Sequence, residues 1–115
     1  MKRDLRLSLQ DVVDSIDKIE EYTKGVSEDS FYENSQVQDA VLRRLEIIGE
    51  AVKHIPKRVR DKYPEVPWKQ IAGTRDVLSH EYFGVHLRNT WKIIHDDLAE
   101  LRGKILEVGK AIEEP

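Results

Sequence analysis

The residues with the widest chemical capacity lie in one stretch of the chain, Gly73–Gly84. Its functional groups are a guanidinium, a carboxylate, a hydroxyl, an imidazole and a phenol, from Arg75, Asp76, Ser79, His80 and Tyr82. A helix that served only for packing would carry aliphatic residues at several of these positions. Because imidazoles transfer protons near neutral pH and guanidinium groups bind anions, this stretch is the first candidate for a functional site.

Helical geometry decides which of these groups can meet. In one continuous helix, Tyr82 lies within about 20° of Arg75, whereas His80 is rotated from Arg75 by about 140°. Arg75 and His80 therefore converge only if the helix is distorted near Ser79, or if two copies of the chain meet about a two-fold axis. A structural arrangement is the alternative, in which Arg75 pairs with an acid, His80 caps the helix and Tyr82 packs under Phe83.

The remaining polar groups do not form a recognised site. The other histidines are His54, His86 and His95. None of them is part of a His-x-x-x-His or Glu-x-x-His pair that could bind a metal ion from one helix. Asp96 and Asp97 are helix neighbours that point about 100° apart. The chain has no glycine-rich phosphate loop and no cysteine for a thiolate site or a disulfide. We therefore expect neither a metal ion nor a cofactor.

Charge is distributed unevenly along the chain. The formal net charge is −3, yet Lys53–Arg75 carries +5, which leaves −8 for the rest. One explanation is an ordinary basic surface between helices, and the other is a surface that attracts anions.

The length of the chain and its apolar pattern limit the number of domains and the type of protein. A chain of 115 residues with regularly spaced apolar residues is expected to form a single domain over residues 1–115. No apolar run approaches the ~20 residues of a membrane span, and the first residues lack the apolar core of a signal peptide. We therefore expect a cytoplasmic protein.

Apolar residues at steps of three and four predict an all-α fold, an up-and-down bundle of four or five helices. The expected helices cover residues 4–24, 35–55, 56–62, 67–82 and 86–112. Gly25 is expected to stop the first of them. Residues 26–34 are expected to form a loop, with Phe31 and Tyr32 tucked against the bundle.

Local signals mark several helix boundaries. The spacing of Ser35 and Gln38 predicts a capping box at the start of the second helix. Pro67 is suited to open the helix that carries the candidate site, and Phe83-Gly84 is expected to close it. Trp68 and Trp91 lie on or beside apolar stripes, so we expect them in the core or in an interface.

The motif Arg75-x4-His80-x-Tyr82 resembles the Arg-x4-6-His motif of the HEPN superfamily, in its extended form with tyrosine. Three further blocks resemble the HepT-like toxin branch at matching places, and they are Arg43–Ala51, Tyr63–Trp68 and His80–Val85. A bare Arg-x4-His is common by chance, but these blocks in this order are not. The resemblance covers nearly the whole chain. Asp76 stands where many relatives carry asparagine.

This resemblance implies a HEPN-type bundle that forms a homodimer, with Arg75 and His80 of both chains lining one cleft. It also implies metal-independent endoribonuclease activity. In that chemistry the ribose 2′-hydroxyl attacks the adjacent phosphate, with His80 as acid/base and Arg75 as the group that stabilises phosphate charge in the transition state. Asp76 is carried over as a further residue of the catalytic site.

The resemblance also implies regulation by a partner protein. In this branch the motif tyrosine, here Tyr82, is similar to the acceptor of AMP from an MNT-type minimal nucleotidyltransferase, the antitoxin of a type VII-like toxin–antitoxin pair. The anionic adduct would block the cleft and repel RNA. With RNA as the substrate, the basic segment is expected to be a rim that steers it, with Lys57 and Arg58 as RNA-binding residues.

Two other functions are compatible with these residues. A non-catalytic helical subunit could dock and regulate the nucleotidyltransferase, or a dimeric bundle could bind a nucleotide between Arg75 and His80. The intact Arg75–His80 pair favours the enzyme.

Overall fold

The computed structural model describes residues 5–73 and 83–113, with the backbone alone for residues 83–86 and 113. Within these ranges every regular element is helical, which confirms the predicted all-α class. In chain order the elements are α1 (Leu5–Thr23), α2 (Glu28–Glu33), α3 (Ser35–Lys53), α4 (Lys57–Arg60), a helical segment over residues 68–73, α6 (Phe83–Lys92), the π-helical turn η1 (Ile93–Asp97) and α7 (Leu98–Glu113).

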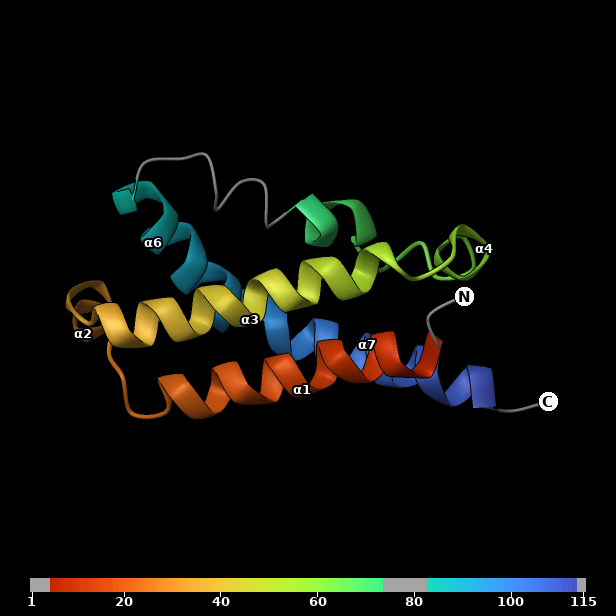
Figure 1. Ribbon diagram of the computed structural model, residues 1–115, viewed down its shortest axis with the longest axis horizontal. Coiled ribbons are helices and arrows are strands. Elements are labelled where there is room, and N and C mark those ends of the chain that lie inside the picture. The colour runs from red at the N-terminus through yellow and green to blue at the C-terminus, as the bar shows by residue number, and fades with distance from the viewer. Residues whose placement is uncertain (1–4, 74–82, 114–115) are drawn as a thin grey trace.

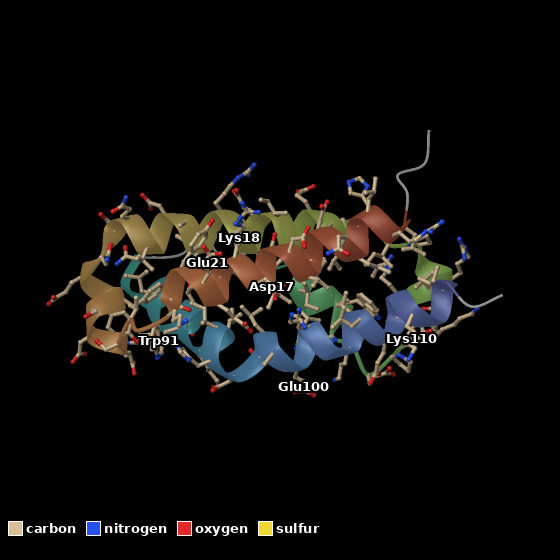
Figure 2. The ribbon with its side chains drawn as sticks, turned by 90° about the horizontal axis from the view of Figure 1, so that it is seen from below. Asp17, Lys18, Glu21, Trp91, Glu100 and Lys110 are labelled. Atoms are coloured by element: carbon tan, nitrogen blue, oxygen red, sulfur yellow. The ribbon has the colours of Figure 1, made fainter. Side chains whose placement is uncertain are left out.

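The scaffold of the molecule consists of α1, α3 and α7. Figure 1 shows α1 and α3 side by side in opposite directions, and in Figure 2 α1 lies between α3 and α7. The apolar stripes face one another in a common core, and its members on these three helices are Leu9, Val12, Val13, Ile16, Ile19, Val41, Leu45, Ile48, Ala51, Val52, Leu98, Leu101, Ile105 and Val108. Burial of these stripes stabilises the helices more than their intrinsic propensities do.

The first helix ends where the sequence predicts. Gly25 follows α1 with φ +75°, in the left-handed region where glycine avoids the strain of a Cβ. The hydroxyl of Thr23 donates to the carbonyl of Ile19 at 2.8 Å, which satisfies one of the last carbonyls of the helix.

The prediction of a loop over residues 26–34 is wrong, because these residues contain α2. Its N-cap is Ser27, whose Oγ accepts from the backbone N–H of Ser30 at 3.1 Å. So short a helix is marginal by itself. Phe31 is fully buried, as predicted, and its carbonyl accepts a 2.8 Å hydrogen bond from the side-chain amide of Gln38 on α3. Tertiary contacts therefore supply the stability that the local sequence lacks.

The cap of α3 also differs by one residue from the prediction. Asn34 is the N-cap, and its Oδ1 accepts from the backbone N–H of Val37 at 3.1 Å, while Ser35 is the first helical residue. Asparagine and serine are comparable caps, so the spacing of Ser35 and Gln38 did not discriminate between them. Gln38 is buried and binds Phe31 instead of closing a capping box.

The last long helix is interrupted, contrary to the expectation of one helix over residues 86–112. Its path is α6, then η1, then α7. A π-helical turn inserts extra residues into a helix without breaking it, so apolar residues on both sides keep facing the core. Leu87 precedes the turn, Ile94 lies within it and Leu98 follows it, and all three are buried.

The chain between α3 and residue 73 is held by side chains as well as by the backbone. Pro56 is the N-cap of α4, close to its predicted place at the start of a short helix. The indole N–H of Trp68 donates to the carbonyls of Arg60 at 3.1 Å and Tyr63 at 3.0 Å. The ammonium of Lys104 on α7 donates to the carbonyl of Glu65 at 3.0 Å. These bonds fix the irregular connection against the scaffold.

The sequence pattern predicted that Phe83-Gly84 would close a helix, and this prediction is wrong. Both residues lie in α6, which begins at Phe83.

None of the helices in the described ranges is long and apolar enough to cross a membrane.

Candidate functional site

The predicted catalytic residues and the predicted modification site, Arg75, Asp76, His80 and Tyr82, lie outside the described residues. Their convergence therefore stays a prediction. The structure does show what supports the chain on either side of them, at the helical segment 68–73 and at α6.

The support before the motif is a short, well-packed helical segment. Trp68 is 7% exposed and Ile71 is 9% exposed, so one face of this segment belongs to the core. The carbonyl of Pro67 accepts from the backbone N–H of Ile71 at 3.0 Å, which makes the first helical turn. Trp68 is therefore a core residue with a satisfied indole, as predicted, and its ring is not an exposed stacking platform.

The support after the motif is α6, which packs against α2. Trp91 belongs to α6, and Figure 2 shows it at the end of the molecule where α6 lies near α2. Its ring lies 5.4 Å from that of Phe31 and 3.9 Å from that of His95, measured between centroids. Leu87 and Thr90 are buried on the same helix. The chain that follows the motif is thus held by an aromatic cluster.

One ionisable group near α6 has a shifted pKa. The hydroxyl of Tyr32 on α2 donates to Oε2 of Glu28 at 2.7 Å. This hydrogen bond raises the pKa of Tyr32, desolvation adds to the rise, and the charge of Arg88 on α6 opposes it. The phenol of Tyr32 therefore donates a hydrogen bond to a carboxylate, which favours its protonated form.

A cavity of about 380 Å³ with a mixed apolar and charged lining lies beside the helical segment 68–73. It is bounded by α3, by this segment and by the η1–α7 junction, through Leu45, Ile48, Pro67, Ile71, Ile93, Leu98 and Leu101. The rest of its lining is polar or charged, and consists of Glu65, Gln70, Asp97, Glu100 and Lys104. Lys104 and Glu100 form an ion pair, with 3.1 Å between Nζ and Oε1. No histidine or arginine of the described residues lines this cavity.

The two predicted RNA-binding residues, Lys57 and Arg58, are exposed on α4. Lys57 forms an ion pair with Asp61, with 2.9 Å between Nζ and Oδ2. Arg58 makes no ion pair among the described residues. The two cations therefore differ in their surroundings, because a carboxylate offsets the charge of Lys57 and no carboxylate of the described residues offsets that of Arg58.

A groove beside α4 contains two cations that the prediction for RNA binding omitted. It has a volume of about 690 Å³, and its charged lining residues are Lys57, Arg60, Asp61 and Lys69. Arg60 is half-buried, and its Nε is buried with no hydrogen-bond partner among the described residues. The i,i+3 spacing of Lys57 and Arg60 places them on one face of α4, which is the signal that could have identified Arg60 from sequence.

The described residues contain no cluster of three or more His, Asp or Glu side chains suited to a metal ion. His54 is exposed after the end of α3, and His95 is exposed on η1 beside Trp91. These two histidines therefore do not form a second candidate site.

Comparison with known proteins places the chain among nucleases. The model of the family described as "Ribonuclease HepT-like" matches residues 12–108. The chain is 42% identical over 110 residues to the "Probable ribonuclease HepT" of Thermococcus cleftensis, covering 96% of this chain and 100% of that protein. It is 41% identical over 113 residues to a "Putative RNase" of Methanocaldococcus jannaschii, covering 98% of this chain and 97% of that protein.

A third relative is longer. It is a "Gamma-glutamylcyclotransferase and putative RNase" of Methanocaldococcus jannaschii, 43% identical over 113 residues. The match covers 98% of this chain but 51% of that protein, so the chain spans about half of its length. No solved structure matches the chain significantly.

Proposed function

Because the chain belongs to the HepT-like ribonuclease family of the HEPN superfamily, we propose that it is a metal-independent endoribonuclease and the toxin of a toxin–antitoxin pair. The observation that carries this proposal is the family match over residues 12–108, which encloses the intact motif Arg75-x4-His80-x-Tyr82. Relatives of nearly the same length are named as ribonucleases, which supports the same activity in this chain.

The proposed reaction is an internal transesterification. The ribose 2′-oxygen forms a bond to the neighbouring phosphorus, and the bond from phosphorus to the 5′-oxygen breaks. His80 takes the proton of the 2′-hydroxyl or returns one to the leaving oxygen. Arg75 binds the phosphate and offsets the charge that develops on its oxygens, and Asp76 belongs to the same site. The products are a 2′,3′-cyclic phosphate, or its hydrolysis product, and a 5′-hydroxyl.

The active form is proposed to be a homodimer. The helical angle between Arg75 and His80 keeps them apart along one smooth helix, whereas two-fold symmetry brings two copies of each together. One cleft between the chains would then hold the RNA strand.

Tyr82 is proposed to be the switch of this activity. A minimal nucleotidyltransferase would transfer AMP from ATP to the phenol oxygen, with release of pyrophosphate, and the anionic adduct would close the cleft to RNA. Mass spectrometry of the chain coexpressed with its antitoxin should find the added AMP on Tyr82. A modified residue elsewhere, or none, would remove this part of the proposal.

Lys57 and Arg58 are proposed to form a basic rim that steers RNA toward the cleft. Both side chains are exposed on α4, and the surrounding segment is the most positive part of the chain. Attraction to phosphates is local and falls with salt, so a basic rim on an acidic chain is physically reasonable.

The decisive experiment compares His80→Ala and Arg75→Ala with the wild type for growth arrest and for cleavage of total RNA in EDTA. Each substitution should lower cleavage by about 10²-fold or more, because it removes an acid/base group or a charge stabiliser. His54→Ala is the matched control, since His54 is an exposed residue that follows α3. Toxicity that persists in both variants, or chelator-sensitive cleavage leaving 3′-hydroxyl ends, would overturn the proposal.

A further inference from the structure

The groove beside α4 has the charge of an anion-binding surface. Of its three cations, Lys57 is neutralised by Asp61 at 2.9 Å. Arg60 and Lys69 remain, and neither forms an ion pair within the described part of the chain. The groove therefore keeps two positive charges that no side chain of the described structure offsets.

Arg60 is held in a state that favours an anionic ligand. Its Nε is buried and lacks an acceptor among the described residues. Arg60 is only half-buried and lines the groove, so a bound oxyanion can reach the part of its side chain that faces the groove. The carbonyl of the same residue is fixed by the indole of Trp68 at 3.1 Å, so the backbone that carries the guanidinium is anchored.

The two walls of the groove are joined to each other. Trp68 belongs to the helical segment 68–73, and its indole N–H also reaches the carbonyl of Tyr63 at 3.0 Å, just beyond α4. Arg60 and Lys69 therefore come from separate helical elements whose spacing is fixed before any ligand arrives. Such preorganisation reduces the entropic cost of binding.

The open shape of the groove suits an extended polyanion better than an enclosed small molecule. The chain also leads directly from the groove to the motif, since Lys69 precedes Arg75 by six residues. We propose that this groove binds the sugar–phosphate backbone of the RNA substrate, with Arg60 and Lys69 as its main phosphate ligands. This inference rests on the proposed ribonuclease function and identifies where the substrate is held outside the catalytic cleft.

The test measures binding without cleavage. The probe is a fluorescein-labelled, 2′-O-methylated single-stranded RNA, which lacks the attacking hydroxyl, and its anisotropy is followed against the full chain at several salt concentrations. Arg60→Gln combined with Lys69→Gln should raise Kd by about 10-fold at low salt and reduce the slope of log K against log salt by about 1–2. The matched control, Lys18→Gln with Lys24→Gln on and just beyond α1, removes the same charge and should change Kd less than twofold.

A substitution of opposite sign sharpens the test. Asp61→Asn removes the only carboxylate that the described residues contribute to the groove lining, and it releases Lys57 from its ion pair. It should tighten RNA binding by about threefold and steepen the salt dependence. If the Arg60 variant folds poorly by circular dichroism, Lys69→Gln and Asp61→Asn still test the groove, since both residues are exposed.

The outcomes separate this inference from the proposed function. A wild-type chain that cleaves RNA, together with groove variants that bind the probe normally, would overturn the groove and leave the ribonuclease intact. A chain that neither cleaves RNA nor binds the probe would overturn both. Groove variants that keep their affinity for RNA but no longer bind the purified nucleotidyltransferase would show that the groove binds an acidic protein surface instead.

Discussion

On the scaffold helices, most cations of the described residues lie within ion-pair distance of a carboxylate, whereas most cations between α4 and residue 69 do not. The scaffold pairs are Lys18 with Glu21, Arg43 with Glu46, Lys53 with Glu50, Arg102 with Asp17 and Lys104 with Glu100. Figure 2 shows Lys18 and Glu21 close together on α1. Among the described cations from α4 to residue 69, Lys57 alone forms an ion pair, with Asp61.

This difference separates stability from function. Exposed ion pairs contribute ~0–1 kcal/mol each, so the scaffold pairs do not hold the fold together. Their effect is to offset the positive charge of the scaffold cations, and the chain outside Lys53–Arg75 carries a net charge of −8. The cations near α4 that form no ion pair among the described residues leave an excess of positive charge there, which the proposed RNA-binding groove requires. Stability itself must come from the apolar core.

The largest effect is expected from Phe31→Ala. Phe31 is fully buried and its ring contacts that of Trp91, so truncation leaves a cavity between α2 and α6. We expect a loss of about 3–5 kcal/mol in the free energy of unfolding, measured by chemical denaturation. Leu106→Ala is the matched control, because Leu106 on α7 is 47% exposed, and it should cost less than about 1 kcal/mol. Equal losses in the two variants would show that the core is not where stability resides.

A smaller effect is expected from Trp68→Phe, which keeps an aromatic ring but removes the indole N–H. The carbonyls of Arg60 and Tyr63 lose their donor, at a cost of about 1–3 kcal/mol. Trp91→Phe is the control, since the indole N–H of Trp91 makes no hydrogen bond among the described residues. Because Trp68 joins the groove walls, its variant should also bind the RNA probe more weakly than the Trp91 variant. Unchanged RNA affinity would argue that wall spacing is unimportant.

The smallest effect is expected from Asp17→Asn, which weakens the bond to Arg102. Nε of Arg102 lies 2.7 Å from Oδ1 of Asp17 and NH2 lies 3.3 Å from Oδ2, and this pairing raises the pKa of the guanidinium. Both side chains are substantially exposed, so the expected loss is about 0–1 kcal/mol in thermal unfolding. The control is Asp39→Asn, which removes a surface carboxylate that forms no ion pair among the described residues. A loss above about 2 kcal/mol would contradict the separation of surface charge from stability.

Much of the fold could be predicted because its helices carry long, regular stripes. The first helix follows its apolar pattern closely, and Gly25 ends it. Predictions failed where local signals were weak or ambiguous. The acidic residues of α2 suggested a loop, because the hydrogen bond from Gln38 to the Phe31 carbonyl, which supports this short helix, is not visible in the local sequence. The η1 turn was missed because steps of three and four are equally consistent with an unbroken helix.

The sequence by itself determined the helical class, the family and the chemical groups of the motif, because apolar periodicity and motif spacing are properties of the chain alone. Only the tertiary structure decided which cations share a surface. Lys57 and Arg58 are neighbours in sequence, yet Lys57 is paired with Asp61 and Arg58 does not line the groove. Arg60 and Lys69 are nine residues apart, and the fold brings them to one groove because Trp68 joins α4 to the helical segment that follows it.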